Sequence, residues 1–242
     1  AMIRDGLFER FPVDGIFGLH NWPGVPPGQF GFVEGPAMAA VDRALIRVVG
    51  RGGHGASPHE TVDPVVAASS LVLALQSIVS RNVDPRQAAV VTVGSIHGGE
   101  ASNVIPGSVE LKLTIRSFDA DVRRQLEERI PALARAQAES FGASAEVSYH
   151  RGFPALTNHV AETQFAREVA LAAFGPERIE PDFKPRMASE DFAFLLEARP
   201  GSYLFVGNGD SAPLHSPAYD FDDAIIAPAA SFWVRLARTF LV

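Results

Sequence analysis

Two histidines have similar surroundings in distant parts of the sequence. His20 lies in "IFGLHNWPG" and His215 in "PLHSPAYDFDD"; each follows a leucine and has a proline within three residues. Proline stiffens a loop, and a metal ligand must be held in a fixed position. The chain has no cysteine, so a metal would be bound by histidines and carboxylates, which suit Zn²⁺, Mn²⁺, Co²⁺ or Ni²⁺. These residues alone leave three readings open: metal ligands, a general base, or ordinary residues at strand ends.

Three aspartates follow His215 within a few residues. Asp220, Asp222 and Asp223 are all close enough in sequence to accept a hydrogen bond from its ring. Such a bond orients an imidazole that binds a metal.

The segment "GRGGHG", residues 50–55, matches the dinucleotide-binding pattern G-x-G-x-x-G after a predicted strand. In that fingerprint the third glycine opens a helix, whose N-terminus holds the pyrophosphate. Here "ASPHETVD" comes before the next helix, so a nucleotide-binding protein using Gly50 to Gly55 is the weakest functional hypothesis. The alternatives are a flexible loop, or glycines that let the loop carry His54 close to another backbone or a ligand.

The middle of the chain predicts a compact module with the element order β-α-β-β-α-β. Alternation in "SVELKLTIR" is typical of a strand in a sheet that is covered on one side. The order is that of the split βαβ, or ferredoxin-like, unit. The predicted strands are 44–49, 88–96, 108–116 and 145–150, and the predicted helices are 61–81 and a second from about 119.

The flanking segments have longer loops, more proline and further helical patterns at 160–175, 189–198 and 223–241. A helical spacing also occurs in "AMIRDGLFERF" at the start. We therefore predict an α/β protein with two domains. Residues 1–40 and 153–242 form one discontinuous α/β domain, and residues 41–152 form the inserted satellite domain.

The charge balance excludes some partners. The net charge is −7 and the pI near 5.5, and no basic run is present to bind nucleic acid or an anionic membrane. We find no apolar stretch of about 18 residues and no signal-peptide pattern at the start. We expect a cytoplasmic protein that binds neither nucleic acid nor membrane.

Six motifs in order carry a family resemblance: "GLHNWPGVPPGQ", "GRGGHGASPHETVDP", "ASNVIPG", "TIRSFD", "SEDF" and "LHSPAYDFDD". Over essentially its whole length the chain resembles the aminoacylase and hippurate hydrolase family of two-metal amidohydrolases, to which auxin-conjugate amidohydrolases and carboxypeptidase G also belong. The resemblance implies a zinc-peptidase-like α/β catalytic domain, interrupted by a ferredoxin-like satellite domain that mediates dimerisation.

The resemblance also implies roles for five residues. His20 and His215 would be metal ligands. His54 would stabilise the oxyanion of the reaction, in many family members in the active site of the partner subunit. Asn103 and Arg116 would bind substrate, since the Arg116 guanidinium suits bidentate binding of a carboxylate.

Four further residues and one alternative belong to the same motifs. His59 and Asp63 match a family run for which we expect a capping or structural role. Glu190 and Asp191 follow Ser189 at a predicted helix start, so we expect them to cap that helix. For Arg116, the alternative is a solvent-facing charge beside Glu110.

The implied reaction is hydrolysis of an N-acyl amino acid by water activated at two divalent metal ions. The edge strand of the satellite domain predicts a homodimer, because such an edge must be capped or paired. Family members carry a Cys/Asp-Gly-His segment and a Glu-Glu pair upstream of the first motif, and neither occurs here. We therefore expect a truncated, inactive form without the general base and part of the metal site. The alternative is a non-catalytic dimerisation or binding module derived from the family.

Overall fold

The computed structural model describes residues 2–241 and consists of two compact units. Unit 1 contains residues 2–38 and 156–241, and unit 2 contains Ala39–Ala155. The chain thus passes between the units close to the boundaries at 41 and 152 that the sequence predicts. The catalytic and dimerisation roles predicted for the two domains stay predictions.

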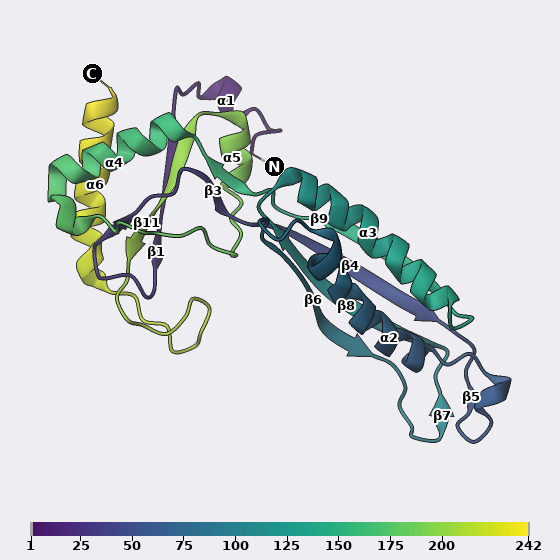
Figure 1. The fold of residues 1–242 in the computed structure, drawn as a ribbon. Helices are drawn as coiled ribbons and strands as arrows, with labels where there is room; N and C mark the ends of the chain where they lie inside the picture. Colours follow the sequence, from purple (N-terminus) through teal and green to yellow (C-terminus); the bar gives the residue numbers. More distant parts are fainter. Residues whose placement is uncertain (1, 242) are drawn as a thin grey trace. The chain divides into compact units, whose positions relative to one another are not determined.

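Unit 2 has one four-stranded sheet with two helices on one face (Figure 1). The strand order is β6-β8-β4-β9, and all neighbours are antiparallel. The element order along the chain is β-α-β-β-α-β, as predicted. The elements are β4 (Ala40–Val49), α2 (Pro64–Ser77), β6 (Ala89–His97), β8 (Ser108–Ser117), α3 (Ala120–Glu139) and β9 (Ser144–Arg151). A small antiparallel pair of strands, β5 (Gly53–His54) and β7 (Val104–Ile105), lies beyond one end of the sheet and is called the β5–β7 pair.

The alternation in β8 separates a buried face from a polar face, as the sequence predicts. Val109, Leu111, Leu113 and Ile115 are at most 4% exposed, while Lys112 lies on the opposite, exposed face. The buried residues pack against both helices. Hydrophobic burial on one side of the sheet therefore fixes which strand residues face outward.

Helix α2 begins at the predicted position. The Asp63 carboxylate accepts hydrogen bonds from the N–H groups of Val65 and Val66 at 2.8 and 3.4 Å, and Pro64 occupies the first helical position. Such a cap satisfies amide groups that have no partner within the helix. The expected capping role of Asp63 is confirmed.

The helical stretch Pro64–Asn82 corrects one expectation from the sequence. By length and composition alone it is apolar enough to cross a membrane. Its inward face packs in the core of unit 2, however, through Ala67, Ala68, Leu71, Leu75 and Ile78. This burial against a sheet is typical of a core helix.

A buried ion pair lies where β4 begins and β9 ends. Asp42 is 1% exposed, and Arg123 of α3 donates to its two carboxylate oxygens at 3.0 and 2.6 Å. The Tyr149 hydroxyl and the Gly152 N–H also donate to Asp42, at 3.0 and 3.1 Å. Burial, followed by the charge of Asp42, raises the pKa of Tyr149. Asp42 therefore joins the segments where the chain enters and leaves unit 2 to helix α3.

Unit 1 has a three-stranded sheet of order β1-β11-β2 and a separate pair, β10 and β3. Helices α4 and α6 cover one face of the larger sheet, and α5 with residues 183–192 covers the other. The helix near the N-terminus, α1, is shorter than the helical spacing in residues 1–11 suggests. The elements are α1 (Leu7–Arg10), β1 (Ile16–Trp22), β2 (Phe30–Gly31), β3 (Gly35–Met38), β10 (Leu156–Asn158), α4 (Val160–Phe174), α5 (Ala193–Ala198), β11 (Gly201–Gly207) and α6 (Ile226–Phe240).

Candidate metal and substrate site

His20 lies near the end of β1, with one ring nitrogen already engaged. Its Nδ1 lies 2.5 Å from the backbone carbonyl oxygen of Asn21. A carbonyl oxygen can only accept, so Nδ1 carries the proton and Nε2 is left as a lone-pair donor. In a metal-binding histidine, a hydrogen bond from the ring nitrogen that does not bind the metal fixes the orientation of the ring.

The His20 ring lies on a wall of aromatic side chains. The alternation of β1 puts His20 and Trp22 on one face, and their ring centroids are 5.8 Å apart. Tyr203 of the parallel neighbour β11 lies 6.5 Å from His20 by the same measure. Gly18 makes room for this tyrosine, because a Cβ at that position would lie 2.4 Å from the tyrosine ring.

The structure changes the role expected for Glu190. Helix α5 begins only at Ala193, and Phe192 before it makes no side-chain cap. Glu190 instead accepts a hydrogen bond from the Tyr203 hydroxyl at 2.9 Å and one from the Asp191 N–H at 3.0 Å. Burial, followed by the Glu190 charge, raises the pKa of Tyr203. The capping role expected for Glu190 is therefore wrong, because the helix starts later than its sequence pattern suggests and the carboxylate binds the tyrosine beside His20. The capping role of Asp191 stays a prediction.

His215 lies in the loop between β11 and α6 and is exposed. This loop is tied to β11 by Asn208, whose side chain bonds to Ser211, to the Asp220 carbonyl and to the Asp222 N–H. Asp222 caps the following turn through the Ala224 N–H at 2.9 Å. Of the three aspartates considered for orienting His215, Asp222 is thus engaged in capping.

A side-chain bond connects this loop with the strand that carries His20. The Asn21 side-chain amide donates to the Tyr219 hydroxyl. Asn21 directly follows His20, and Tyr219 lies four residues after His215. The bond therefore joins the segments that carry the two predicted ligands.

The backbone of His215 is unusual. Within residues 2–241 it is the one non-glycine residue with a positive φ, at 66°. The left-handed conformation costs an L-residue about 1–2 kcal/mol, and such strain clusters at functional sites. We expect His215→Gly to be more stable to urea unfolding than His215→Ala by about 1 kcal/mol, although neither variant retains the imidazole. A glycine variant less stable than the alanine variant would contradict this reading of the loop.

The donor set of unit 1 fits a divalent metal in chemistry but not in number. His20 offers Nε2 from a fixed ring, and His215 offers an exposed imidazole, which are suitable donors for zinc. Among residues 2–241, however, no three histidine, aspartate or glutamate side chains gather closely enough to hold a metal ion. A zinc ion usually has at least three protein ligands, so two histidines account for only part of such a site.

Unit 2 brings His54 and Asn103 together at the β5–β7 pair. His54 pairs with Val104, and the Gly55 N–H donates to the Asn103 carbonyl at 2.8 Å. The His54 Nδ1 accepts from the Ala56 N–H at 3.0 Å. In the neutral ring the proton is therefore on Nε2, which makes the exposed His54 a hydrogen-bond donor.

The glycines of residues 50–55 are explained by contacts within the protein. A Cβ at Gly50 would lie 2.2 Å from the Val62 carbonyl oxygen, and one at Gly52 would lie 2.6 Å from that of Ile105. The next α-helix, α2, starts only at Pro64, with the Asp63 side chain already capping its N-terminus. These contacts favour the hypothesis that the glycines let the His54 loop approach another backbone, and they leave no phosphate cradle of the dinucleotide type.

Arg116 lies on the polar face of β8, near the opposite end of the strand. It pairs with Val41 of β4 and Val90 of β6. Partial burial, followed by the charge of Arg43, lowers the pKa of its guanidinium. Glu110 lies at the other end of β8 and forms its ion pair with Lys112 at 3.3 Å. The alternative of a simple charge beside Glu110 therefore does not fit.

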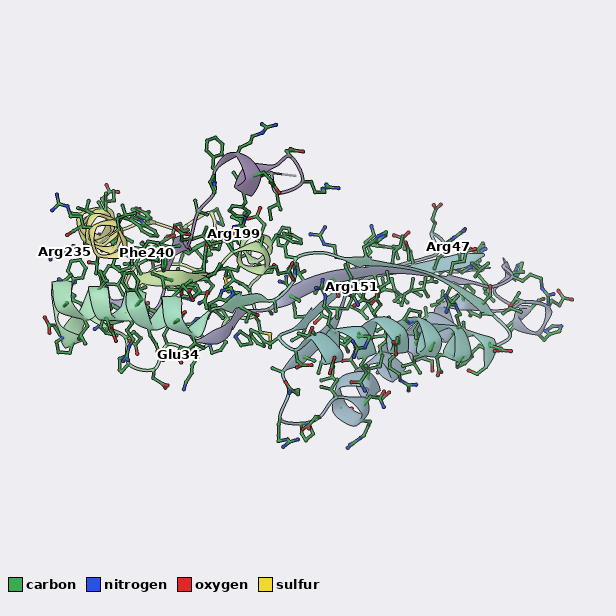
Figure 2. All side chains as sticks on the ribbon, turned by 90° about the horizontal axis from the view of Figure 1, so that it is seen from above. Glu34, Arg47, Arg151, Arg199, Arg235 and Phe240 are labelled. Carbon is green, nitrogen blue, oxygen red and sulfur yellow. The ribbon has the colours of Figure 1, made fainter. Side chains whose placement is uncertain are left out.

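The sheet separates Arg116 widely from His54. Strand β8 runs from Ser108, next to the β5–β7 pair, to Arg116, a distance of about 26 Å at 3.3 Å per residue. In Figure 2, Arg151 lies toward the Arg116 end of this sheet and Arg47 lies toward its other end. An N-acyl amino acid spans only roughly 10 Å. One copy of unit 2 therefore cannot place both side chains on the same substrate.

Sequence reasoning missed the hydrogen-bonded pair of Tyr203 and Glu190 beside His20. Tyr203 lies in the buried strand "GSYLFVG", where its hydroxyl and that of Ser202 are the polar groups of an otherwise apolar run. A buried tyrosine hydroxyl usually has a partner, and this rule was the available signal. Its partner Glu190 is too distant in sequence to be inferred locally.

Comparison with known proteins places this geometry in context. The family model described as peptidase family M20/M25/M40 matches residues 1–239. The chain is 41% identical over 241 residues to hippurate hydrolase of Campylobacter jejuni, covering 100% of this chain and 63% of the relative. It is 41% identical over 240 residues to N-acetyl-L-cysteine deacetylase of Bacillus subtilis, covering 99% and 56%. The chain thus spans about three fifths of the length of these relatives.

Solved structures agree with this result. A crystal structure from methicillin-resistant Staphylococcus aureus matches with a TM-score of 0.88 and 28% identity, covering 98% of this chain and 60% of that one. A Bacillus subtilis dinuclear metal binding peptidase from the M20 family matches with a TM-score of 0.79 and 29% identity, covering 98% and 59%. The resemblance inferred from the six sequence motifs is confirmed.

Proposed function

Since the chain belongs to peptidase family M20/M25/M40, we propose that the protein is a metal-dependent amidohydrolase that cleaves N-acyl amino acids. The observation that carries the proposal is the geometry of His20. Its Nδ1 is hydrogen-bonded to the Asn21 carbonyl, so its Nε2 can offer a lone pair to a metal ion. The substrate class is supported by the relatives named hippurate hydrolase and N-acetyl-L-cysteine deacetylase. The cytosolic location expected from the sequence stays a prediction.

In this proposal His20 and His215 are the ligands that this chain contributes to a site for two divalent ions. Bound metal would supply Lewis acidity and lower the pKa of a water molecule. His54 donates from Nε2 to the carbonyl oxygen as charge develops there. Asn103 and Arg116 bind the substrate from different subunits, because Asn103 lies beside His54 and Arg116 lies at the other end of β8. The Arg116 guanidinium binds the substrate carboxylate.

We also propose that the protein works as a homodimer in which His54 acts on the partner's substrate. The support is the distance of about 26 Å along β8 between its two ends. One end carries Arg116, and the other lies next to the β5–β7 pair that contains His54. Strands β6 and β9 are the edges of this sheet, and pairing at an edge across a two-fold axis gives a closed dimer.

Mixing two variants tests this arrangement. His20→Ala and His54→Ala should each be nearly inactive, whereas a mixture allowed to exchange subunits should regain about a quarter of wild-type activity. About half of the dimers would then be mixed, and each mixed dimer would contain one intact site. Sedimentation should show a dimer at micromolar concentration; a monomer, or exchange without recovery, would contradict the proposal.

The activity itself is tested on the protein expressed from its complete gene. We expect release of glycine from benzoylglycine after addition of Zn²⁺ or Mn²⁺, and loss of that release after chelation. Glycine is quantified by an amine-reactive dye. No release with any of Zn²⁺, Mn²⁺, Co²⁺ or Ni²⁺ would reject the proposal.

A non-catalytic dimerisation or binding module is the second candidate. It is favoured by the lack, in the part of the chain that the structure describes, of three metal-ligating side chains in one place. It predicts dimer formation without stoichiometric metal. Metal content by mass spectrometry, measured beside the hydrolysis assay, separates the two functions.

A further inference from the structure

Arg186 is a cation in unit 1 to which the sequence analysis assigns no role. It lies in the segment before α5, where its backbone N–H donates to the Ala37 carbonyl at 2.9 Å and pairs this segment with β3 at Met38. These contacts fix the backbone at Arg186, from which the side chain extends.

Two aromatic rings fix the guanidinium. Its Cζ lies 4.5 Å from the Phe183 ring centroid and 5.4 Å from that of Trp22. Phe183 in turn stacks on the fully buried Phe205 at 4.6 Å. Arginine stacks in this way on aromatic faces while its edge stays available for hydrogen bonds. The platform therefore presents the guanidinium in one orientation.

The hydrogen-bonding capacity of Arg186 is unused. Within residues 2–241 its side chain makes no ion pair or hydrogen bond, and its Nε is buried without a partner. Burial lowers the pKa of this guanidinium, and the charge of Glu180 opposes that shift. A buried donor without a partner is costly and calls for an explanation, such as an ion or ligand bound nearby.

The position beside Trp22 connects Arg186 with the candidate metal site. The same indole contacts the His20 ring on β1, at 5.8 Å between centroids. The imidazole and the guanidinium thus both contact one tryptophan. A ligand held near His20 would have a carboxylate-binding group within reach of its far end.

We propose that Arg186 binds a second carboxylate of the substrate and so selects N-acyl derivatives of acidic amino acids. This inference rests on the proposed function, in which Arg116 binds the carboxylate common to all N-acyl amino acids. A planar guanidinium with free donors matches a carboxylate in both geometry and charge.

The test compares benzoylglutamate, which has two carboxylates, with benzoylglycine, which has one. For Arg186→Gln we expect kcat/KM to fall about 10- to 100-fold for benzoylglutamate and to change less than about twofold for benzoylglycine. Arg186→Lys should be intermediate, because it keeps the charge but not the planar fork. Equal losses for both substrates, or none, would overturn the proposal.

A matched control lies in the same unit. Arg199, labelled in Figure 2, also stacks on an aromatic ring, with its Cζ 4.7 Å from the Phe8 centroid, but it already bonds to the Ala198 carbonyl at 2.7 Å. Arg199→Gln should leave the preference between the two substrates unchanged. Thermal unfolding of each variant identifies any loss of fold.

Binding measured without turnover keeps this inference separate from the proposed activity. Calorimetry with metal-free protein should show benzoylglutamate binding about tenfold more weakly to Arg186→Gln than to wild type. If the wild type hydrolyses neither substrate but this difference is found, the proposed reaction fails and the carboxylate site stands. If the wild type hydrolyses both and no difference is found in binding or kcat/KM, the carboxylate site fails and the reaction stands.

Discussion

Replacing His20 with alanine is expected to lower kcat/KM for benzoylglycine by at least about 10³-fold, because a metal contributes several kcal/mol of transition-state stabilisation. The ring offers Nε2 to a metal while Nδ1 is held by the Asn21 carbonyl at 2.5 Å. Alanine removes that donor and leaves the strand unchanged. The measurement is initial rate in the metal-supplemented protein from the complete gene, with bound metal determined on the same sample.

The control for this variant is His59→Ala. The His59 side chain is 78% exposed and its nearest charge is Glu60, at 4.0 Å. We expect its activity and metal content to stay within about twofold of wild type, as for most surface substitutions. Full activity of His20→Ala, or equal losses in both variants, would reject a ligand role for His20.

Replacing Asp42 with alanine is expected to lower the free energy of unfolding by about 3–5 kcal/mol, the range for breaking a buried ion pair by removing one partner. Asp42 is 1% exposed and accepts from Arg123, Tyr149 and Gly152. Alanine would leave a guanidinium, a hydroxyl and an amide without their acceptor in the same buried place. Urea unfolding followed by circular dichroism should show a lower midpoint.

The exposed pair of Asp121 and Arg124 gives the comparison. Their side chains are 81% and 60% exposed, although the oxygen and nitrogen are 2.7 Å apart. Water and salt screen such a pair, so Asp121→Ala should cost less than about 1 kcal/mol. A loss for Asp42→Ala as small as this would show that the buried cluster adds little to stability.

The element order and several local features of the fold could be predicted from the sequence. Alternation in residues 108–116 identifies the buried face of β8, because side chains of a strand point alternately to two faces. Asp63 before Pro64 predicts a helix start. The same local signals failed at α5, where "SEDF" resembles a helix start but Glu190 bonds to Tyr203.

Part of the candidate site also follows from the sequence. His20, His54, Asn103, Arg116 and His215 come from six motifs and their order, and the family is confirmed by the match over residues 1–239. The individual roles of these residues stay predictions. Motifs identify which residue types recur together, but they contain no distances.

What the sequence alone determined are features coded within short windows: strand periodicity, helix caps, proline-stiffened loops and the motif order that indicates the family. Only the tertiary structure decided the contacts between distant segments. It pairs Asp42 with Arg123, separates Arg116 from the β5–β7 pair by most of a strand, and stacks Arg186 on Trp22 and Phe183. The physical reason is that such contacts depend on how sheets and helices pack, and packing joins residues that no local pattern relates.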